Sequence, residues 1–211
     1  MIVIIFTNGS YGNPGFYKEY LKKFEAPYII CADGGANFTK KIGLIPNVIL
    51  GDLDSISEET LRCYRDVEIR RYPVCKDETD TQLAFNHAIE IGATEVIVFG
   101  ALGTRLDHSL GNIYLLTRFL EAGIQGLIVD EKNDIFLIQD KKVLNLPIGT
   151  VISLLPLGGN VEGLNIQGFK YPILNGKMTL ENPYGISNVT ARERQIISLE
   201  KGILLVDIPK D

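Results

Sequence analysis

The sequence predicts an α/β fold, with a mainly parallel sheet flanked by helices, followed by a small antiparallel β-sandwich domain. Up to about residue 130, short apolar runs rich in β-branched residues alternate with stretches of helical spacing, a pattern typical of βαβ units. Beyond that point the helical periodicity ends, and short apolar runs separated by Gly, Pro and Asn follow. We therefore expect an α/β domain over residues 1–130 and a β-sandwich domain over residues 131–211.

The elements of the first domain follow from the period of its apolar residues. Strands are predicted where four or so neighbouring residues are apolar and β-branched. These runs are residues 2–6, 28–32, 48–50, 68–72, 96–99 and 127–129. Helices are predicted where apolar residues recur every three or four positions, and these stretches are residues 16–24, 36–42, 58–64, 81–91 and 109–121. Gly92 and Gly123 follow two of these stretches, where a glycine typically ends a helix.

The second domain contains only strand-length runs separated by turn residues. The runs are residues 134–139, 151–155, 161–166, 177–180, 195–199 and 203–208. The dipeptide Asn175-Gly176 lies just before one of them and predicts a tight type I′ hairpin turn. The absence of a Pro/Ser-rich linker near residues 130–133 predicts that the two domains pack closely.

Composition excludes several classes of function. Lys and Arg number 21 against 26 Asp and Glu, and the formal net charge of −5 argues against non-specific binding to nucleic acid or to an anionic membrane. No apolar run is long enough to span a bilayer, so we expect no membrane segment. Three cysteines without a C-x-x-C pair favour a reducing cytoplasm. With only two histidines, a histidine-rich zinc site is excluded, and the chemistry must depend on carboxylates.

Aspartates follow the predicted strands at their carboxyl ends, where ligands bind in an open α/β sheet. They are Asp33, Asp52, Asp54, Asp77, Asp80 and Asp107. Any one of them is more often a helix cap than a ligand, but so many like charges at one edge require a counter-ion. Asp52 and Asp54 point to the same side of an extended segment, so they can converge on one ion. Oxygen ligands of this kind suit Mg²⁺ bound together with substrate phosphates.

Basic residues accompany these aspartates. Lys76 and Arg105 can hold phosphate oxygens or, as a simpler alternative, form salt bridges with neighbouring aspartates. Neither a P-loop nor a dinucleotide-binding fingerprint occurs, so a nucleotide would be held by metal, by Lys and Arg and by loop backbone. His108, beside Asp107, is predicted to orient or pack, and His87 to lie within a helix as surface or core filler.

Five short strings carry a family resemblance. They are Ala32–Asn37 (ADGGAN), Gly51–Ser55 (GDLDS), Lys76–Asp80 (KDETD), Gly100–His108 (GALGTRLDH) and Ile186–Asn188 (ISN). Each is weak alone, but the ordered set resembles the thiamine pyrophosphokinase (thiamine diphosphokinase) family. The resemblance implies Mg²⁺-assisted transfer of pyrophosphate from ATP to the hydroxyl of thiamine, giving thiamine diphosphate and AMP. It also implies a homodimer with active sites between subunits.

The same resemblance implies roles for individual residues. The catalytic residues would be Asp52, Asp54, Asp77, Asp80 and Arg105, and the four aspartates would also hold the metal. The nucleotide would be bound by Asp33, Lys76, Arg105, Asp107 and His108, and thiamine by Ser187 and Asn188. Some members of the family place a tryptophan against the thiamine ring. This chain has no tryptophan, and Tyr184 is the alternative stacking residue.

Two other classes of function remain open from the residues alone. Asp52-Leu53-Asp54 is similar to the D-x-D nucleophile motif of Mg²⁺-dependent phosphohydrolases, although those enzymes usually place the pair after the first strand. The chain can also be a non-catalytic nucleotide-binding module. Incubation with ATP, Mg²⁺ and thiamine separates these alternatives, because only the transferase forms AMP in a thiamine-dependent manner.

Overall fold

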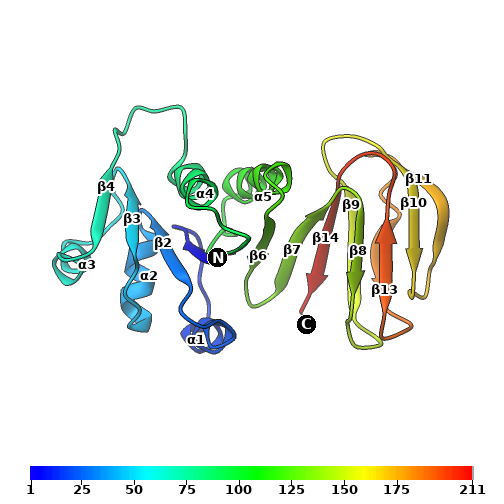
Figure 1. Ribbon diagram of the computed structural model, residues 1–211, viewed down its shortest axis with the longest axis horizontal. Helices are drawn as coiled ribbons and strands as arrows, with labels where there is room; N and C mark the ends of the chain where they lie inside the picture. Colours follow the sequence, from blue (N-terminus) through cyan, green and yellow to red (C-terminus); the bar gives the residue numbers. More distant parts are fainter. Residues whose placement is uncertain (211) are drawn as a thin grey trace. The chain divides into compact units, whose positions relative to one another are not determined.

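The computed structural model describes residues 1–210, in two units: Met1–Glu131 and the residues from Lys132 onwards (Figure 1). Each unit has its own hydrophobic core. Within the described residues, none of the helices is long and apolar enough to cross a membrane.

The first unit is built on a parallel sheet with the spatial strand order β6-β5-β1-β2-β3-β4. Its strands are β1 (Ile2–Phe6), β2 (Tyr28–Ala32), β3 (Val48–Gly51), β4 (Glu68–Arg71), β5 (Glu95–Phe99) and β6 (Gln125–Val129). Its helices are α1 (Pro14–Leu21), α2 (Gly35–Ile42), α3 (Glu58–Cys63), α4 (Asp80–Glu90) and α5 (Leu106–Glu121). Helices α1 and α2 cover one face of the sheet, and α4 and α5 cover the other (Figure 1). The predicted parallel α/β architecture is confirmed.

The central strands are apolar throughout because helices bury both of their faces. Ile4 and Phe6 of β1 belong to the core beneath α1 and α2, while the alternate residues Val3 and Ile5 are equally buried. On the α4–α5 side, Phe85 stacks on Phe119 with ring centroids 4.3 Å apart. Fixed strands of this kind give the loops at their carboxyl ends defined starting points.

An aromatic contact fixes the segment that follows β1. The Tyr11 ring stacks on Phe38 at 3.8 Å between centroids, and its hydroxyl donates a hydrogen bond to the carbonyl of Thr7 (2.6 Å). The Thr7 hydroxyl in turn donates to the carbonyl of Gly100 (2.5 Å). The loops after β1 and β5 are therefore tied to each other and to the core.

Helix α5 begins at Leu106, three residues before its predicted start. Leu106 is 72% exposed, so it contributes nothing to an apolar period, and the N-cap Arg105 makes no side-chain capping bond. Asp107 and His108 consequently lie in the first turn of α5 and not in the preceding loop. The carboxyl-terminal ends of α4 and α5 lie where the sequence predicts them. Gly92 and Gly123 directly follow the C-caps of these helices and have left-handed φ angles of 74° and 70°, as expected for glycines that end a helix.

Two antiparallel sheets form the second unit, with strand orders β12-β9-β14-β7 and β11-β10-β13-β8. Their strands are β7 (Asn133–Ile138), β8 (Lys141–Leu144), β9 (Val151–Pro156), β10 (Val161–Gln167), β11 (Ile173–Met178), β12 (Gly185–Val189), β13 (Gln195–Ser198) and β14 (Leu204–Pro209). Buried residues of both sheets, such as Leu154 and Val206 of one and Ile166 and Ile197 of the other, share one core. The predicted β-sandwich is confirmed.

The hairpin turn predicted at Asn175-Gly176 is wrong. Both residues lie inside β11, where Gly176 pairs with Leu164 and the register with β10 shifts on either side of that pair. Asn175 has a φ of 49°, the left-handed conformation that also occurs in bulges. The dipeptide therefore bends a strand, and this strand covers residues 173–178 and not the predicted residues 177–180.

His87 is buried on α4, with 5% of its surface exposed. The Arg70 guanidinium lies 3.1 Å from its Nδ1, and because Arg70 can only donate, Nδ1 is the acceptor and the proton is on Nε2. Burial is the main reason that the pKa of His87 is below its ordinary value, and the Arg70 charge lowers it further. Glu90 and Glu68 oppose this shift, and the Tyr28 ring packs nearby.

We expect this histidine to make the protein less stable in mild acid. The unfolded chain binds a proton at His87 as the pH falls through about 6.5, whereas the folded chain resists protonation, so unfolding becomes more favourable below that pH. The effect is about 1.4 kcal/mol for each unit by which the two pKa values differ. Thermal melts of the wild type and His87→Asn between pH 7.5 and 5.5 check this. The wild type should lose more stability over this range, and parallel curves for the two proteins would contradict the expectation.

Candidate active site

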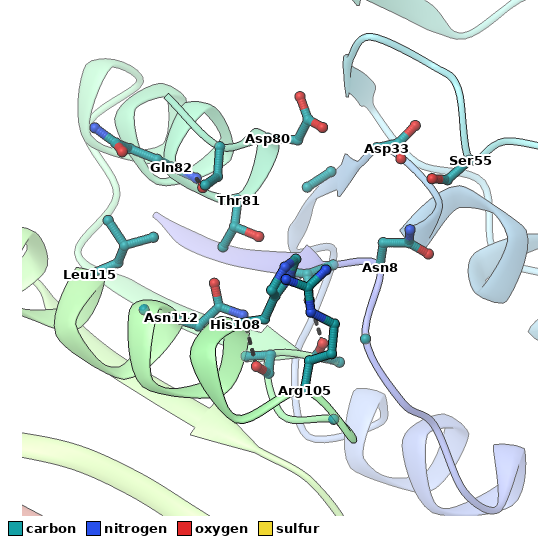
Figure 2. Close-up of a pocket in the computed structure, with 18 of the residues that line it drawn as sticks. Asn8, Asp33, Ser55, Asp80, Thr81, Gln82, Arg105, His108, Asn112 and Leu115 are labelled. Carbon is teal, nitrogen blue, oxygen red and sulfur yellow. Dashed lines mark hydrogen bonds between the residues drawn. The ribbon is translucent and has the colours of Figure 1, made fainter. Parts of the chain in front are cut away.

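A pocket of about 850 Å³ opens at the carboxyl ends of the parallel strands of the first unit (Figure 2). It is lined by the segments that follow β1, β2, β3, β4 and β5 and by the first turns of α4 and α5. The chain runs outward from β1 to β4 and then returns to place β5 on the other side of β1. The pocket therefore lies at the point where the strand order reverses, which is the usual ligand site of an open α/β sheet.

Three aspartates from three different segments meet on one side of this pocket. Oxygen atoms of Asp33, Asp52 and Asp80 lie within 4.8 Å of one another. Asp33 is 4% exposed, and burial raises the pKa of its carboxyl, with opposing contributions from Ser55 and Gly34 and a further increase from the charge of Asp80. Oδ1 of Asp33 is buried and accepts no hydrogen bond from the described residues, and Oδ1 of Asp80, also buried, is paired with the Lys76 ammonium. This donor set can hold a metal ion.

Gly51 makes the close approach of two of these carboxylates possible. It is the last residue of β3 and has a φ of 144°. A Cβ at this position would lie 3.1 Å from the Asp33 Cβ and 3.1 Å from the Asp80 Cγ. A glycine here leaves the space that Asp33 and Asp80 occupy.

The simpler interpretation of Asp80 as a helix cap does not fit. Thr79 is the N-cap of α4, and its hydroxyl accepts a hydrogen bond from the Gln82 amide (3.1 Å). Asp80 is the first helical residue, so its carboxylate is not needed for capping and points into the pocket (Figure 2).

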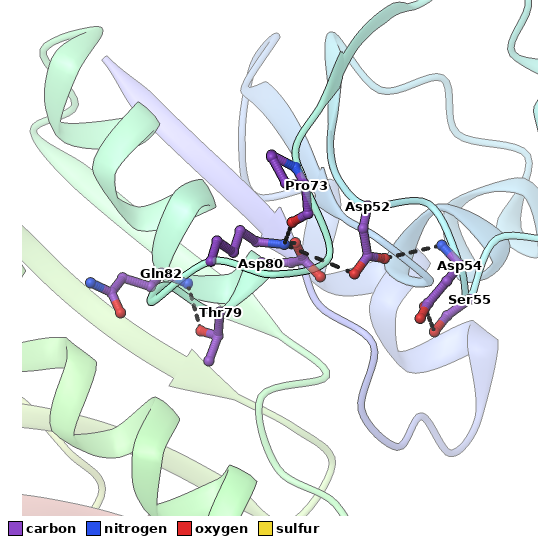
Figure 3. A network of polar contacts seen from close by, with 8 residues as sticks. Asp52, Asp54, Ser55, Pro73, Thr79, Asp80 and Gln82 are labelled. Carbon is purple, nitrogen blue, oxygen red and sulfur yellow. Dashed lines mark hydrogen bonds and ion pairs between the residues drawn. The ribbon is translucent and has the colours of Figure 1, made fainter.

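Asp52 and Asp54 do not converge as an extended segment would make them. Leu53 has a φ of 69°, so the chain turns after Gly51, and the Asp54 amide donates to the Asp52 carboxylate (3.1 Å). The Asp54 carboxylate accepts from the Ser55 hydroxyl (2.8 Å; Figure 3). Asp54 lines the pocket but is not one of the three clustered carboxylates. The carboxylate beside Asp52 and Asp80 is that of Asp33, where the sequence had predicted Asp54.

Lys76 forms the salt bridge that was one of its two predicted alternatives. Its Nζ lies 3.0 Å from the Asp80 carboxylate and 3.9 Å from that of Asp52. The neighbouring Asp77 is exposed and does not line the pocket, whereas Glu78 does. Of the four aspartates predicted as metal ligands, the structure brings together Asp52 and Asp80.

A basic group lies across the pocket from the carboxylates (Figure 2). Arg105 donates two hydrogen bonds to Asp107, at 3.2 Å from Nε and 2.6 Å from Nη2. The guanidinium lowers the pKa of the Asp107 carboxyl to about 2, so this partner stays ionised and holds Arg105 in place. His108 is exposed and lines the pocket beside them. The pocket thus has an acidic side, which can hold a metal ion, and a side with the Arg105 guanidinium, which can bind an anion.

Several pocket residues are not among those predicted from the sequence. They are Asn8, Ser10, Thr81, Gln82, Asn112 and Leu115. Asn8 and Ser10 follow β1 directly, so the rule that identified the aspartates, polar residues after a buried strand, applies to them too. Asn112 lies one helical turn beyond His108, and its amide donates to the carbonyl of Ala101 (2.7 Å).

Ser187 and Asn188 lie on β12 of the second unit. Ser187 is exposed, has a φ of 55°, and donates a hydrogen bond from its backbone amide to the Ser153 hydroxyl (3.1 Å). The Asn188 side chain is buried, and its amide is engaged with the backbone of Tyr171, at 3.2 Å and 2.8 Å. Asn188 thus holds the segment in shape, while the Ser187 hydroxyl is accessible.

The fold and the pocket define an α/β protein joined to a β-sandwich, with an acidic site able to hold a metal. The family described as "Thiamin pyrophosphokinase, catalytic domain" matches residues 17–128, and "Thiamin pyrophosphokinase, vitamin B1 binding domain" matches residues 137–204. The chain therefore belongs to the thiamin pyrophosphokinase family, and the enzyme class predicted from the ordered motifs is confirmed.

Individual relatives agree with this assignment. The chain is 33% identical over 181 residues to the thiamine pyrophosphokinase of Bacillus subtilis (strain 168), covering 84% of this chain and 85% of that protein. It is 27% identical to thiamine pyrophosphokinase 1 of Oryza sativa subsp. japonica, covering 83% and 76%. The crystal structure of the Bacillus subtilis enzyme superposes with a TM-score of 0.90 at 29% identity over 100% of both chains. That of Geobacillus thermodenitrificans gives 0.87 at 27% identity, over 100% of this chain and 98% of the other.

Proposed function

We propose that the protein transfers the pyrophosphoryl group of ATP to the hydroxyl of thiamine, giving thiamine diphosphate and AMP, with Mg²⁺ as the metal. The single observation that carries this proposal is the cluster of Asp33, Asp52 and Asp80 inside a pocket that also presents Arg105. The vitamin B1 binding domain match over residues 137–204 supports thiamine as the acceptor.

The donor set supports magnesium in particular. Carboxylates without histidine or thiolate ligands are typical of a hard cation, and Asp33 Oδ1 is buried without a hydrogen bond from the described residues. In the proposal Asp52 and Asp80 bind the metal, with Asp33 completing the cluster and Asp54 at its edge. A Mg²⁺ ion held by these carboxylates would supply neutralisation of the charge on the phosphate oxygens.

The remaining groups position and orient the reactants. Arg105, held by Asp107, binds phosphate oxygens in a bidentate manner, Lys76 adds positive charge around the same anion, and His108 offers a ring nitrogen as a hydrogen-bond donor. The thiamine oxygen attacks the β-phosphorus of ATP, the bond from that phosphorus to the α–β bridging oxygen breaks, and AMP leaves. The motif predicts Asp77 or Asp80 as the acceptor of the hydroxyl proton, and Asp80 is the proposed one because it lines the pocket and Asp77 does not. As in other phosphoryl transfers, positioning and electrostatics supply most of the catalysis.

Thiamine recognition is assigned to the second unit. The exposed Ser187 hydroxyl contacts the pyrimidine, Asn188 shapes the segment around it, and the half-exposed ring of Tyr184 stacks on the substrate.

We further propose a homodimer, since exposed apolar side chains such as Leu174 and Ile186 would be buried in a subunit interface. The free cysteines support a reducing compartment, the cytoplasm.

An assay of AMP formation tests the proposal. The full chain is incubated with ATP and Mg²⁺, with and without thiamine, and AMP and thiamine diphosphate are quantified together. We expect equal amounts of both products, formed only when thiamine is present, and no reaction in excess EDTA. Phosphate release that does not need thiamine would favour the phosphohydrolase, and nucleotide binding without turnover would favour a binding module.

A further inference from the structure

The ammonium group of Lys76 lies where a cation would lie on the acidic side of the pocket. Only 13% of the side chain is exposed. Its Nζ lies 3.0 Å from Asp80 Oδ1 and 3.9 Å from Asp52 Oδ2, and it donates to the carbonyl of Pro73 (3.0 Å). Figure 3 labels these three partners. A buried ammonium is stable only when paired, and here its partners are two of the three clustered carboxylates.

We infer that Lys76 is a built-in counter-ion that competes with the divalent metal for Asp80 and Asp52 and turns to the polyphosphate when nucleotide and metal bind together. This inference rests on the proposed function, because it assigns the cluster to a metal. It goes further in making Lys76 a residue that weakens the binding of the free metal and couples metal binding to nucleotide binding.

The electrostatics of the cluster lead to this coupling. A metal ion entering the cluster would face a positive charge already in contact with Asp80, and like charges a few ångströms apart repel strongly in a partly buried site. The triphosphate brings negative charge that can take over the ammonium. Because binding free energies are reciprocal, a nucleotide that removes this repulsion strengthens metal binding, and the metal strengthens nucleotide binding by the same factor.

The side chain is suited to such a move. An ammonium on a flexible four-carbon stem carries three donors that it can redirect, and it forms no fixed bidentate pair. Its partner Pro73 lies on the same loop, so this contact can persist while the contact to Asp80 is exchanged. Lys76 and Pro73 lie in the loop between β4 and α4, and Asp80 is the first residue of α4, so the core strands need not move.

Binding of Mn²⁺ to the full chain tests the inference. Calorimetry measures the affinity for Mn²⁺ with and without α,β-methylene-ATP, in the wild type, Lys76→Gln and Lys76→Arg. Without nucleotide, we expect Lys76→Gln to bind Mn²⁺ at least tenfold more tightly than the wild type. Lys76→Arg retains the charge and should stay within about threefold of it. The nucleotide should tighten Mn²⁺ binding to the wild type at least tenfold, and much less in Lys76→Gln.

Thermal melts in EDTA and in Mn²⁺ provide a second readout if Lys76→Gln folds poorly. Without its counter-ion the cluster repels itself, so Lys76→Gln should melt lower than the wild type in EDTA and gain more from Mn²⁺. Equal Mn²⁺ affinity in the wild type and Lys76→Gln would overturn the inference and leave the metal site intact. Failure of all three proteins to bind Mn²⁺, with or without nucleotide, would overturn the metal site of the proposed function and the inference with it.

Discussion

Asp80→Asn is expected to lower thiamine-dependent AMP formation by about 1,000-fold, which corresponds to roughly 4 kcal/mol of lost transition-state stabilisation. The substitution keeps the shape of the side chain but removes a charged ligand from the three-carboxylate cluster. The fold should survive, because Thr79 and not Asp80 caps α4, and the Lys76 ammonium keeps the Asp52 carboxylate and the Pro73 carbonyl as partners when the charge of Asp80 is removed. Turnover is measured at saturating ATP and Mg²⁺, and folding is checked by circular dichroism and thermal melting.

Asp77→Asn provides the matched comparison three residues earlier. It removes the same charge from the same segment, but Asp77 is exposed and lies outside the pocket lining. We expect a much smaller loss of turnover than for Asp80→Asn. An equal loss would return Asp77 to the metal or proton-transfer role that the motif Lys76–Asp80 predicts, and near-normal turnover of Asp80→Asn would remove Asp80 from the site.

The parts of the fold that the sequence predicted are those where burial dictates the residue type. Strands β1, β3 and β5 are covered on both faces, so they are short, uninterrupted apolar runs. Strands β8 and β12 were missed because both lie at the edges of their sheets. β8 reads KKVL, and charged residues at an edge leave no apolar alternation to recognise. In β12, Gly185 and the left-handed Ser187 indicate a turn and not a strand.

The sequence predicted the location of the site more accurately than the residues that form its carboxylate cluster. The strand-end rule identified Asp33, Asp52 and Asp80 together with three other aspartates. Which three carboxylates converge depends on the left-handed Leu53 that turns the chain after β3, and on Gly51, whose missing side chain leaves room between β2 and α4. The spacing of residues within one motif predicts neither the φ angle of Leu53 nor the contact between segments that are distant in the sequence.

Gly51→Ala is expected to reduce both stability and turnover. A φ of 144° is strained for any residue with a side chain, at a cost of roughly 1–3 kcal/mol. For a chain of this size each kcal/mol lowers the melting temperature by roughly 2–4 °C. The new Cβ would also lie 3.1 Å from Asp33 and Asp80 and push the two carboxylates out of position. Turnover should fall by about 100-fold, since small displacements of positioning groups have effects of this size.

Gly43→Ala separates the strain from the effect on the carboxylates. Gly43 also has a positive φ, 73°, at the end of α2, but a Cβ there meets nothing within 4 Å. Gly43→Ala should therefore lower the melting temperature while turnover at a temperature well below the transition stays near that of the wild type. If Gly51→Ala behaved in the same way, losing stability but retaining turnover and Mn²⁺ binding, the close approach of Asp33 and Asp80 would not matter for catalysis. A loss of both in Gly51→Ala alone would mean that the glycine at the end of β3 maintains the geometry of the metal site.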